Sequence, residues 1–177
     1  MISVPEMRRI SMLTNYRDYV RPGKGRCDLS GILADPEAMT SLTEDMSAPF
    51  LEVAIDKVVA LDAIGFVFGA RIAQRLNTGL VLMRKPGKLS VETRSISFSD
   101  YTKTDKSFEI AADAIKPNES VLIVDDWSET GAQLKAAAAL VESIGGKVVG
   151  LTCINIDSPV CKDEALSKYR MHSVIEY

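Results

Sequence analysis

The sequence is poor in the features that indicate a membrane protein, a disulfide framework or a nucleic-acid-binding protein. Its 177 residues include three cysteines, Cys27, Cys153 and Cys161, too few and too scattered for a disulfide framework or paired zinc ligands. It has no run of about 18 apolar residues and no apolar signal-peptide core near the N-terminus. The formal charge of -3 argues against nucleic-acid binding through general basicity. These absences predict a cytoplasmic protein that binds neither membrane nor nucleic acid.

Fingerprints of three common phosphate-binding classes are also missing. The chain has no G-x-x-x-x-G-K-[ST] loop and no G-x-G-x-x-G after an apolar run. A phosphatase of the Asp-x-Asp type needs an acid at position 127, which is occupied by Trp127. The P-loop, Rossmann dinucleotide and Asp-x-Asp phosphatase interpretations are therefore weak.

The apolar pattern predicts the fold. A hydrophobic content of 46% and a charged content of 25% indicate one compact domain over residues 1–177. Apolar runs at 57–62, 79–85, 121–126 and 147–156 predict strands, and the patterns at 66–77 and 131–146 predict helices. Continuous Val, Ile and Leu strands separated by helices imply parallel strands that are covered on both faces. We therefore expect a doubly wound α/β domain with a mostly parallel central sheet.

Residues 86–107 interrupt this alternation. The segment is polar, with Pro and Gly early and alternating Val, Ile and Phe later. A segment of this length inside a compact domain is typical of a lid or a hairpin flap over a site, or of a disordered segment.

The segment "VLIVDDWSETGAQ", residues 121–133, carries the strongest functional signal. Asp125 and Asp126 directly follow a buried strand, and ligands of open α/β sheets bind outside the carboxyl ends of the strands. The next turn leads into a helix, so its N–H groups can surround a phosphate. Because carboxylates repel phosphate, the acids and the turn must bind different parts of one ligand, and a sugar phosphate meets this demand. The alternative is an N-cap beside a solvated loop charge.

This segment resembles the phosphoribosyl diphosphate-binding motif of the type I phosphoribosyltransferases. "GFVFG" at 65–69 and "RKPGKL" at 84–89 are similar to the adenine-type branch of that family, and the resemblance covers most of the chain. It implies a homodimeric enzyme that uses Mg2+ and transfers the 5-phosphoribosyl group of phosphoribosyl diphosphate to a purine. Residues 1–50 would form the hood and base pocket, and 86–107 would form a flexible flap.

The resemblance also implies a role for each part of the site. Ribose 5-phosphate would be bound by Asp125, Asp126, Glu129, Thr130, Gly131, Ala132 and Gln133. Diphosphate would face Ala63, Ile64, Arg84, Lys85 and Lys88, and the base would face Lys24, Gly25, Arg26 and Trp127. Mg2+ would be held mainly by substrate oxygens and water, near the two aspartates. Asp100 on the flap and Glu129 are candidates for proton transfer at the base; for Glu129 a solvated loop carboxylate is the alternative.

Several positions depart from the family pattern. Ile64 stands where the adenine-type enzymes typically have an arginine beside the diphosphate, and Gln133 stands where a Thr or Ser often completes the phosphate loop. Arg26 replaces a stacking aromatic, Cys27 an arginine and Lys24 an apolar residue. If these cations point inward, the pocket should prefer oxo groups or a carboxylate to the amino group of adenine; if they point outward, they are solvated loop charges.

These departures leave other functions open. Trp127 either stacks on the base or packs against the sheet. The base could be adenine, a 6-oxopurine or another heterocycle. The chain could also be a non-catalytic regulator that binds phosphoribosyl diphosphate or a nucleotide, or a phosphoribosyl-binding hydrolase.

Overall fold

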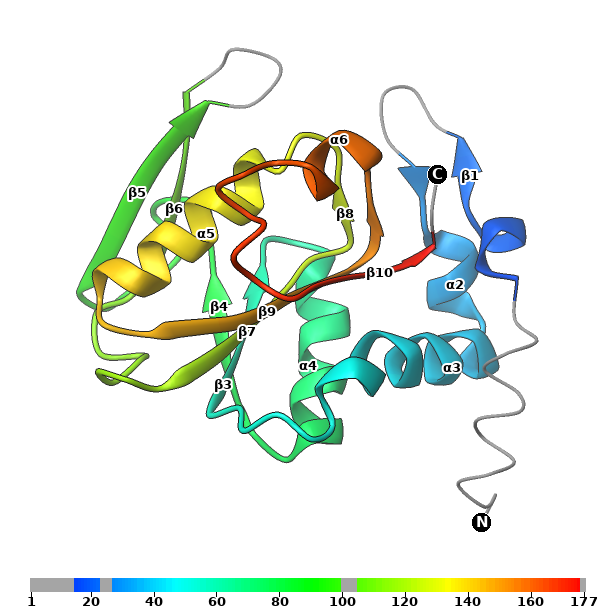
Figure 1. The fold of residues 1–177 in the computed structure, drawn as a ribbon, viewed down its shortest axis with the longest axis horizontal. Coiled ribbons are helices and arrows are strands. Elements are labelled where there is room, and N and C mark those ends of the chain that lie inside the picture. Colours follow the sequence, from blue (N-terminus) through cyan, green and yellow to red (C-terminus); the bar gives the residue numbers. More distant parts are fainter. Residues whose placement is uncertain (1–14, 23–26, 100–104, 176–177) are drawn as a thin grey trace.

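A central parallel sheet organises the molecule (Figure 1). The computed structural model describes residues 15–22, 27–99 and 105–175. The sheet has six strands in the order β10-β9-β7-β3-β4, with β8 paired to β9, and every pairing is parallel. The strands are β3 (Lys57–Leu61), β4 (Gly79–Met83), β7 (Ser120–Val124), β8 (Trp127–Ser128), β9 (Lys147–Ile156) and β10 (Met171–Ile175). The predicted parallel sheet is confirmed.

Two cores cover the two faces of this sheet. Val59 and Ile123 contribute to the core under α5 (Ala132–Ser143). Val58 and Leu122, their neighbours along β3 and β7, contribute to the core under α3 (Pro36–Ser47) and α4 (Gly65–Leu76). Alternate residues of one strand therefore serve opposite layers, which explains why the strands read as continuous apolar runs. The doubly wound α/β class is confirmed.

Local signals set the helix ends. α3 begins where Asp35 accepts hydrogen bonds from the N–H groups of Glu37 and Ala38, with proline at the first helical position. α4 stops at Asn77, which adopts the left-handed conformation with φ 54°. α5 is closed by Gly145, whose φ of 92° is costly for other residues. The helices predicted at 66–77 and 131–146 therefore correspond to α4 and α5.

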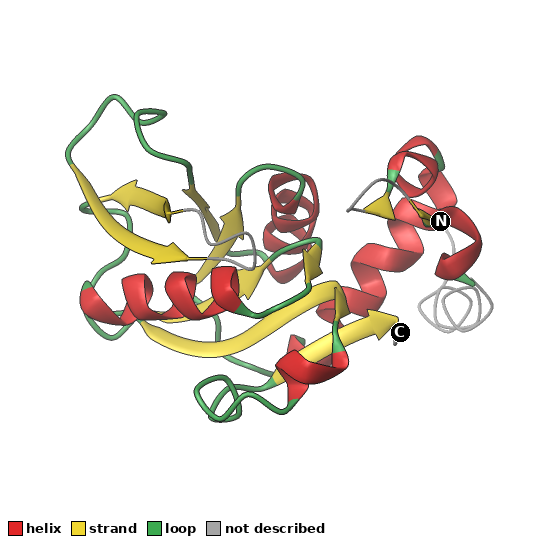
Figure 2. Cartoon of the chain, turned by 90° about the horizontal axis from the view of Figure 1, so that it is seen from above, coloured by secondary structure: helices red, strands yellow, loops and turns green. Residues whose placement is uncertain are grey.

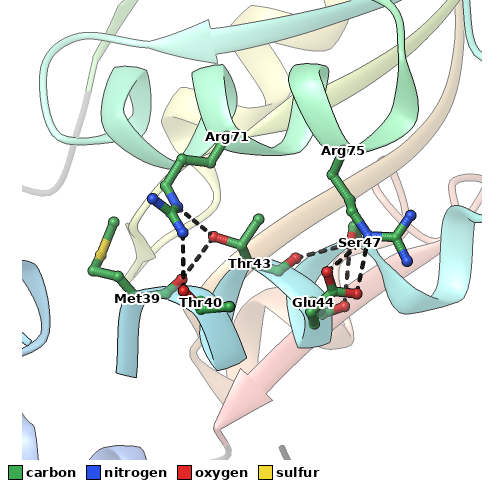
Figure 3. A network of polar contacts seen from close by, with 7 residues as sticks. All are labelled: Met39, Thr40, Thr43, Glu44, Ser47, Arg71 and Arg75. Atoms are coloured by element: carbon green, nitrogen blue, oxygen red, sulfur yellow. Dashed lines mark hydrogen bonds and ion pairs between the residues drawn. The ribbon is translucent and has the colours of Figure 1, made fainter. Parts of the chain in front are cut away.

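A polar network joins α3 to α4 (Figure 3). Arg71 donates from Nε to Thr43 Oγ1 at 2.9 Å and from Nη2 to Thr40 Oγ1 at 3.3 Å. One turn later, Arg75 Nε lies 2.8 Å from Glu44 Oε1. These contacts fix which side of α4 faces α3, and they thereby help to place the loop that precedes α4.

Most of the remaining elements lie towards the two ends of the molecule. An antiparallel hairpin of β5 (Thr93–Ser99) and β6 (Asp105–Ala111) forms one end, and the N-terminal elements form the other (Figure 1, Figure 2). The N-terminal elements are η1 (Tyr16–Tyr19), α2 (Ser30–Ala34) and the ribbon of β1 (Arg21–Pro22) with β2 (Cys27–Asp28). η2 (Ala48–Phe50) follows α3, and α6 (Ser158–Cys161) follows β9.

The hairpin corresponds to the segment predicted as a flap over 86–107, but its second strand continues to Ala111. The extension has a physical reason, because Phe108 and Ile110 are buried in the core under α5. The tip, residues 100–104, lies outside the described residues. None of the described helices is long and apolar enough to cross a membrane.

Candidate active site

Three loops meet at the carboxyl ends of β3, β4 and β7, as expected for parallel strands. They comprise residues 62–64, 84–89 and 125–131. A Cβ added at Gly65 would lie 3.1 Å from Asp125 Oδ1, so the loop before α4 packs directly on this aspartate. Asp62, in the same loop, lies 3.7 Å from Arg84 Nε and 4.0 Å from Lys85 Nζ. The structure thus brings together three groups of residues that the sequence assigned to one ligand.

The two aspartates are not equivalent. Asp125 is buried, and its Oδ1 accepts the N–H of Asp126 at 2.9 Å. Burial, and then the charge of Asp126, raise the pKa of Asp125 well above its usual value. Asp126 is half-buried, so its carboxylate is the more accessible of the two. Asp125 can therefore keep its proton at a pH where an exposed aspartate is ionised.

The turn after the aspartates is shaped like an anion cradle. Gly131 has a φ of 72°, and a Cβ there would lie 2.9 Å from Val160 Cγ1, so backbone conformation and packing both require glycine. Within the described part of the chain, the N–H groups of Glu129, Thr130 and Gly131 donate no hydrogen bond. They lie at the N-terminus of α5, which has no side-chain cap. Free N–H groups at a helix N-terminus form a site for a phosphate.

The side chains of this turn suit the same task. Thr130 Oγ1 accepts the N–H of Ala132 at 3.4 Å, which bends the chain into α5. Glu129 and Thr130 are exposed, and Ala132 and Gln133 are half-buried. The ribose 5-phosphate role of these residues stays a prediction, and their arrangement is compatible with it.

A second loop carries positive charge to the rim of the site. The guanidinium of Arg84 lies 5.7 Å from the centre of the Phe66 ring, and its Nη1 donates to the carbonyl of Lys88 at 3.2 Å. Its Nε has no hydrogen-bond partner among the described residues, although it lies within ion-pair distance of Asp62. Lys85 and Lys88 are exposed. Asp62 and Phe66 therefore hold Arg84 beside the loop that precedes α4.

At position 64, where the resemblance implies an arginine, the chain has an isoleucine. Ala63 and Ile64 are exposed, and the Ile64 side chain keeps 37% of its surface in solvent. Arg84 and Lys85 reach the same loop through Asp62 and bring cationic charge there. Both cations therefore lie near the loop in which Ile64 carries no charge.

Glu109 was missed by reasoning from the sequence. It is 7% exposed, and its Oε1 accepts the N–H groups of Lys88 at 2.8 Å and Leu89 at 3.0 Å. Its own backbone pairs with that of Arg84. Burial acts to raise the pKa of Glu109, but the N–H donors of residues 87–89 and the charge of Arg84 outweigh it and hold the pKa below its usual value. This carboxylate therefore shapes the cationic loop. The only sequence signal is a lone acid between Phe108 and Ile110.

Two acids lie near the base side of the site. Trp127 is half-buried, and both Trp127 and Cys27 pack against the core under α3 and α4. Burial, and then the charges of Glu129 and Asp157, raise the pKa of Cys27, so both acids lie near β2. Of the residues assigned to the base or to proton transfer, Lys24, Gly25, Arg26 and Asp100 lie outside the described residues.

Asn155 and Asp157 were also missed. Asn155 is fully buried at the end of β9 and donates from Nδ2 to Asp157 Oδ1 at 2.6 Å, while its Oδ1 has no partner among the described residues. A polar pair at the end of the apolar run "CINID" was the available signal.

Comparisons with known proteins identify the family of this chain. Residues 37–175 match the model of the phosphoribosyl transferase domain. An adenine phosphoribosyltransferase of Rhodopirellula baltica is 41% identical over 90% of this chain and 77% of its own. The structure of an adenine phosphoribosyltransferase from Rhodothermus marinus is similar with a TM-score of 0.86 and 30% identity, covering 96% of this chain and 99% of the other.

A second solved structure is that of adenine phosphoribosyltransferase from Saccharomyces cerevisiae, complexed with an imino-altritol bisphosphate and adenine. It has a TM-score of 0.81 and 25% identity, and the match covers 95% of this chain and 99% of that one. The domain match over residues 37–175 and the identity to these relatives lead to one conclusion: this chain belongs to the phosphoribosyl transferase family.

Proposed function

We propose that the protein transfers the 5-phosphoribosyl group of phosphoribosyl diphosphate to adenine, giving adenosine monophosphate and diphosphate. One observation carries the proposal: an acid pair, a turn of free N–H groups and a cationic loop surround one place at the sheet edge. The choice of adenine is supported by the relatives named above, which are called adenine phosphoribosyltransferases.

Each loop takes the part of the substrate that its chemistry suits. Asp126, with Asp125 beneath it, accepts hydrogen bonds from the ribose hydroxyls. Residues 129–133, through the free N–H groups of Glu129, Thr130 and Gly131, hold the 5-phosphate. Arg84, Lys85 and Lys88 face the diphosphate. The acids and the cations of the site thereby lie on different loops.

Mg2+ accompanies the diphosphate in this proposal. No group of three or more His, Cys, Asp and Glu side chains that could hold a metal occurs among the described residues. Asp126 offers one half-buried carboxylate, so most ligands of the ion would be substrate oxygens and water, as Mg2+ usually prefers. When bound, the ion neutralises charge on the diphosphate.

The reaction needs charge stabilisation more than covalent catalysis. The bond from the anomeric carbon to the diphosphate oxygen breaks, and the diphosphate leaves with the electron pair. A ring nitrogen of the base forms the new bond and then loses its proton. The acids stabilise the cation-like sugar, and the cationic loop stabilises the leaving group. The β5–β6 hairpin excludes water, and Asp100 and Glu129 remain the candidates for accepting the proton.

A homodimer and a cytoplasmic location belong to the same proposal. Exposed apolar side chains occur on the edge strand β4 and at the start of α4: Ile64 is 37%, Val67 42% and Leu80 39% exposed. An apolar group on a sheet edge favours contact with a second copy of the chain. The location in the cytoplasm is supported by the three unpaired cysteines.

The test measures diphosphate release from labelled phosphoribosyl diphosphate with adenine, hypoxanthine, guanine, xanthine or orotate. We expect release with adenine and Mg2+. Asp126→Asn should weaken phosphoribosyl diphosphate binding, whereas the matched control Asp113→Asn, at an exposed position, should not. Binding without turnover of any base would instead support a regulator, for which Ile64 is the best observation. Release without a base would support a hydrolase.

A further inference from the structure

The side chain of Asn155 is oriented by its neighbour. Its amide nitrogen donates to Asp157 Oδ1 at 2.6 Å. A carboxylate only accepts hydrogen bonds, so the NH2 end of the amide must face Asp157 and the carbonyl end must face away. Reversing the amide would place two oxygens against each other.

The carbonyl oxygen of this amide lacks a donor. Asn155 is fully buried, and no described residue donates to its Oδ1. A buried polar atom without a partner is uncommon in folded proteins, because desolvation of the atom is not compensated. The unpaired acceptor therefore calls for an explanation, and a ligand that brings an N–H group is one.

Asn155 lies on the base side of the proposed site. It is the register partner of Trp127 in the parallel pair of β8 and β9, so the two side chains lie on the same face. Its backbone N–H approaches the carbonyl of Asp126 at 3.4 Å, and Asp126 is a proposed ribose ligand. In the nucleotide the base is bonded to the ribose, so residues next to a ribose ligand are close to the base.

Two acids lie near this position. Asp157 holds the amide of Asn155, and the charges of Asp157 and Glu129 both reach Cys27 on β2. A carbonyl acceptor flanked by two acids attracts a group that donates N–H. An oxo group would meet it as a second acceptor.

We propose that Asn155 is a specificity-determining residue whose side-chain oxygen accepts a hydrogen bond from the exocyclic amino group of the base, selecting an aminopurine over a 6-oxopurine. This inference rests on the proposed function. The oxygen is covered in the ligand-free molecule, so its neighbours must shift when the base binds. Trp127 is the only tryptophan of the chain and lies beside Asn155. Its fluorescence should therefore change on binding of the base.

The test compares nucleotides that differ at one substituent. Adenosine monophosphate and purine riboside monophosphate share every group except the amino group. In calorimetric titrations the wild-type protein should bind the amino nucleotide at least about ten-fold more tightly, because the unsubstituted one leaves the buried oxygen unpaired. Asn155→Leu should bring this ratio near one, with the affinity for ribose 5-phosphate unchanged.

A swap provides the control for folding and for position. In the double variant Asn155→Asp with Asp157→Asn, the new amide can donate to the new carboxylate, and an acceptor still faces the base. This variant should keep the preference for the amino nucleotide. Thermal unfolding checks that each variant is folded.

Two results would overturn the role of Asn155: equal wild-type affinity for the two nucleotides, or an equal loss for both in Asn155→Leu, which would indicate a structural role. A wild-type protein that discriminates between the nucleotides but converts no base would refute the transferase proposal alone.

Discussion

Glu109 offers a sharp test of how the cationic loop is held. Its carboxylate is buried, and one oxygen accepts two backbone N–H groups, from Lys88 at 2.8 Å and Leu89 at 3.0 Å. The loop carries Arg84, Lys85 and Lys88, which we assign to the diphosphate. Removing the carboxylate should therefore impair binding of phosphoribosyl diphosphate and leave binding of the base unchanged.

The magnitude follows from these two bonds. A hydrogen bond to a charged group contributes about 1.5–3 kcal/mol, and two bonds to one oxygen are not additive. Glu109→Ala should therefore destabilise the ordered conformation of the loop by about 2 kcal/mol. At about 1.4 kcal/mol per factor of ten, the KM for phosphoribosyl diphosphate should rise roughly 30-fold. Glu109→Gln keeps an acceptor oxygen and loses only the charge, so we expect a rise of about five-fold.

Steady-state rates with each substrate varied in turn provide the assay. The KM for adenine should stay within about two-fold of wild type in both variants, since the loop does not reach the base. Glu164→Gln is the matched control, because it removes the same charge from an exposed position. An unchanged KM for phosphoribosyl diphosphate in Glu109→Ala, or a parallel rise for both substrates, would refute the reasoning.

The pH dependence of Glu109 has a definite sign. Its pKa is held below the usual value in the folded protein, so its contribution is complete above the unfolded pKa of about 4.3 and is lost as the pH falls through the lower folded pKa. Glu109→Gln should therefore lose less stability than wild type on acidification, as measured by thermal unfolding.

Three other predictions follow from the site and the sheet edge. Asp125→Asn should weaken ribose 5-phosphate binding. Because the pKa of Asp125 is raised in the folded protein, the wild type loses stability as the pH rises through that pKa. The substitution should therefore raise the unfolding temperature at high pH and not at low pH. Gly131→Ala should cost about 1–3 kcal/mol in denaturant unfolding, because it strains a positive φ and approaches Val160. Val67→Asp should convert a dimer to a monomer in sedimentation. Because Val67 is exposed in the single chain, the substitution should change the unfolding temperature of the monomer little.

The sheet was predictable because its strands are buried on both faces. Val58 and Val59 serve opposite cores, so both had to be apolar, and the same holds for β7 and β9. Lys147–Ile156 was predicted with its observed bounds, since Gly145 and Gly146 mark its start. β10 (Met171–Ile175), in contrast, is short and half-buried, and it gave no apolar run to detect.

The acid pair and its turn were predictable for a related reason. Asp125 to Gln133 are contiguous, so one strand end and one helix start place them all. Glu109 acts on residues about twenty positions earlier in the chain, and Asn155 lies opposite Trp127 only because β8 pairs with β9. Such residues are positioned by strand pairing, which a local motif does not reveal.

The two predictions for the base pocket name different side chains, which differ in how strongly they discriminate between an oxo group and an amino group of the base. Lys24 and Arg26 favour an oxo group if they point inward, but they lie outside the described residues, and a cation in a solvated loop is screened by water and salt. The oxygen of Asn155 has no access to water, so any base that fails to donate to it leaves it unpaired. Discrimination by a buried acceptor is stronger than attraction by a screened charge, because the wrong base must bear the whole desolvation of that acceptor. Selection of an amino group through Asn155 should therefore persist at high salt, whereas any preference due to Lys24 and Arg26 should fade, and nucleotide titrations at rising salt concentration would separate the two.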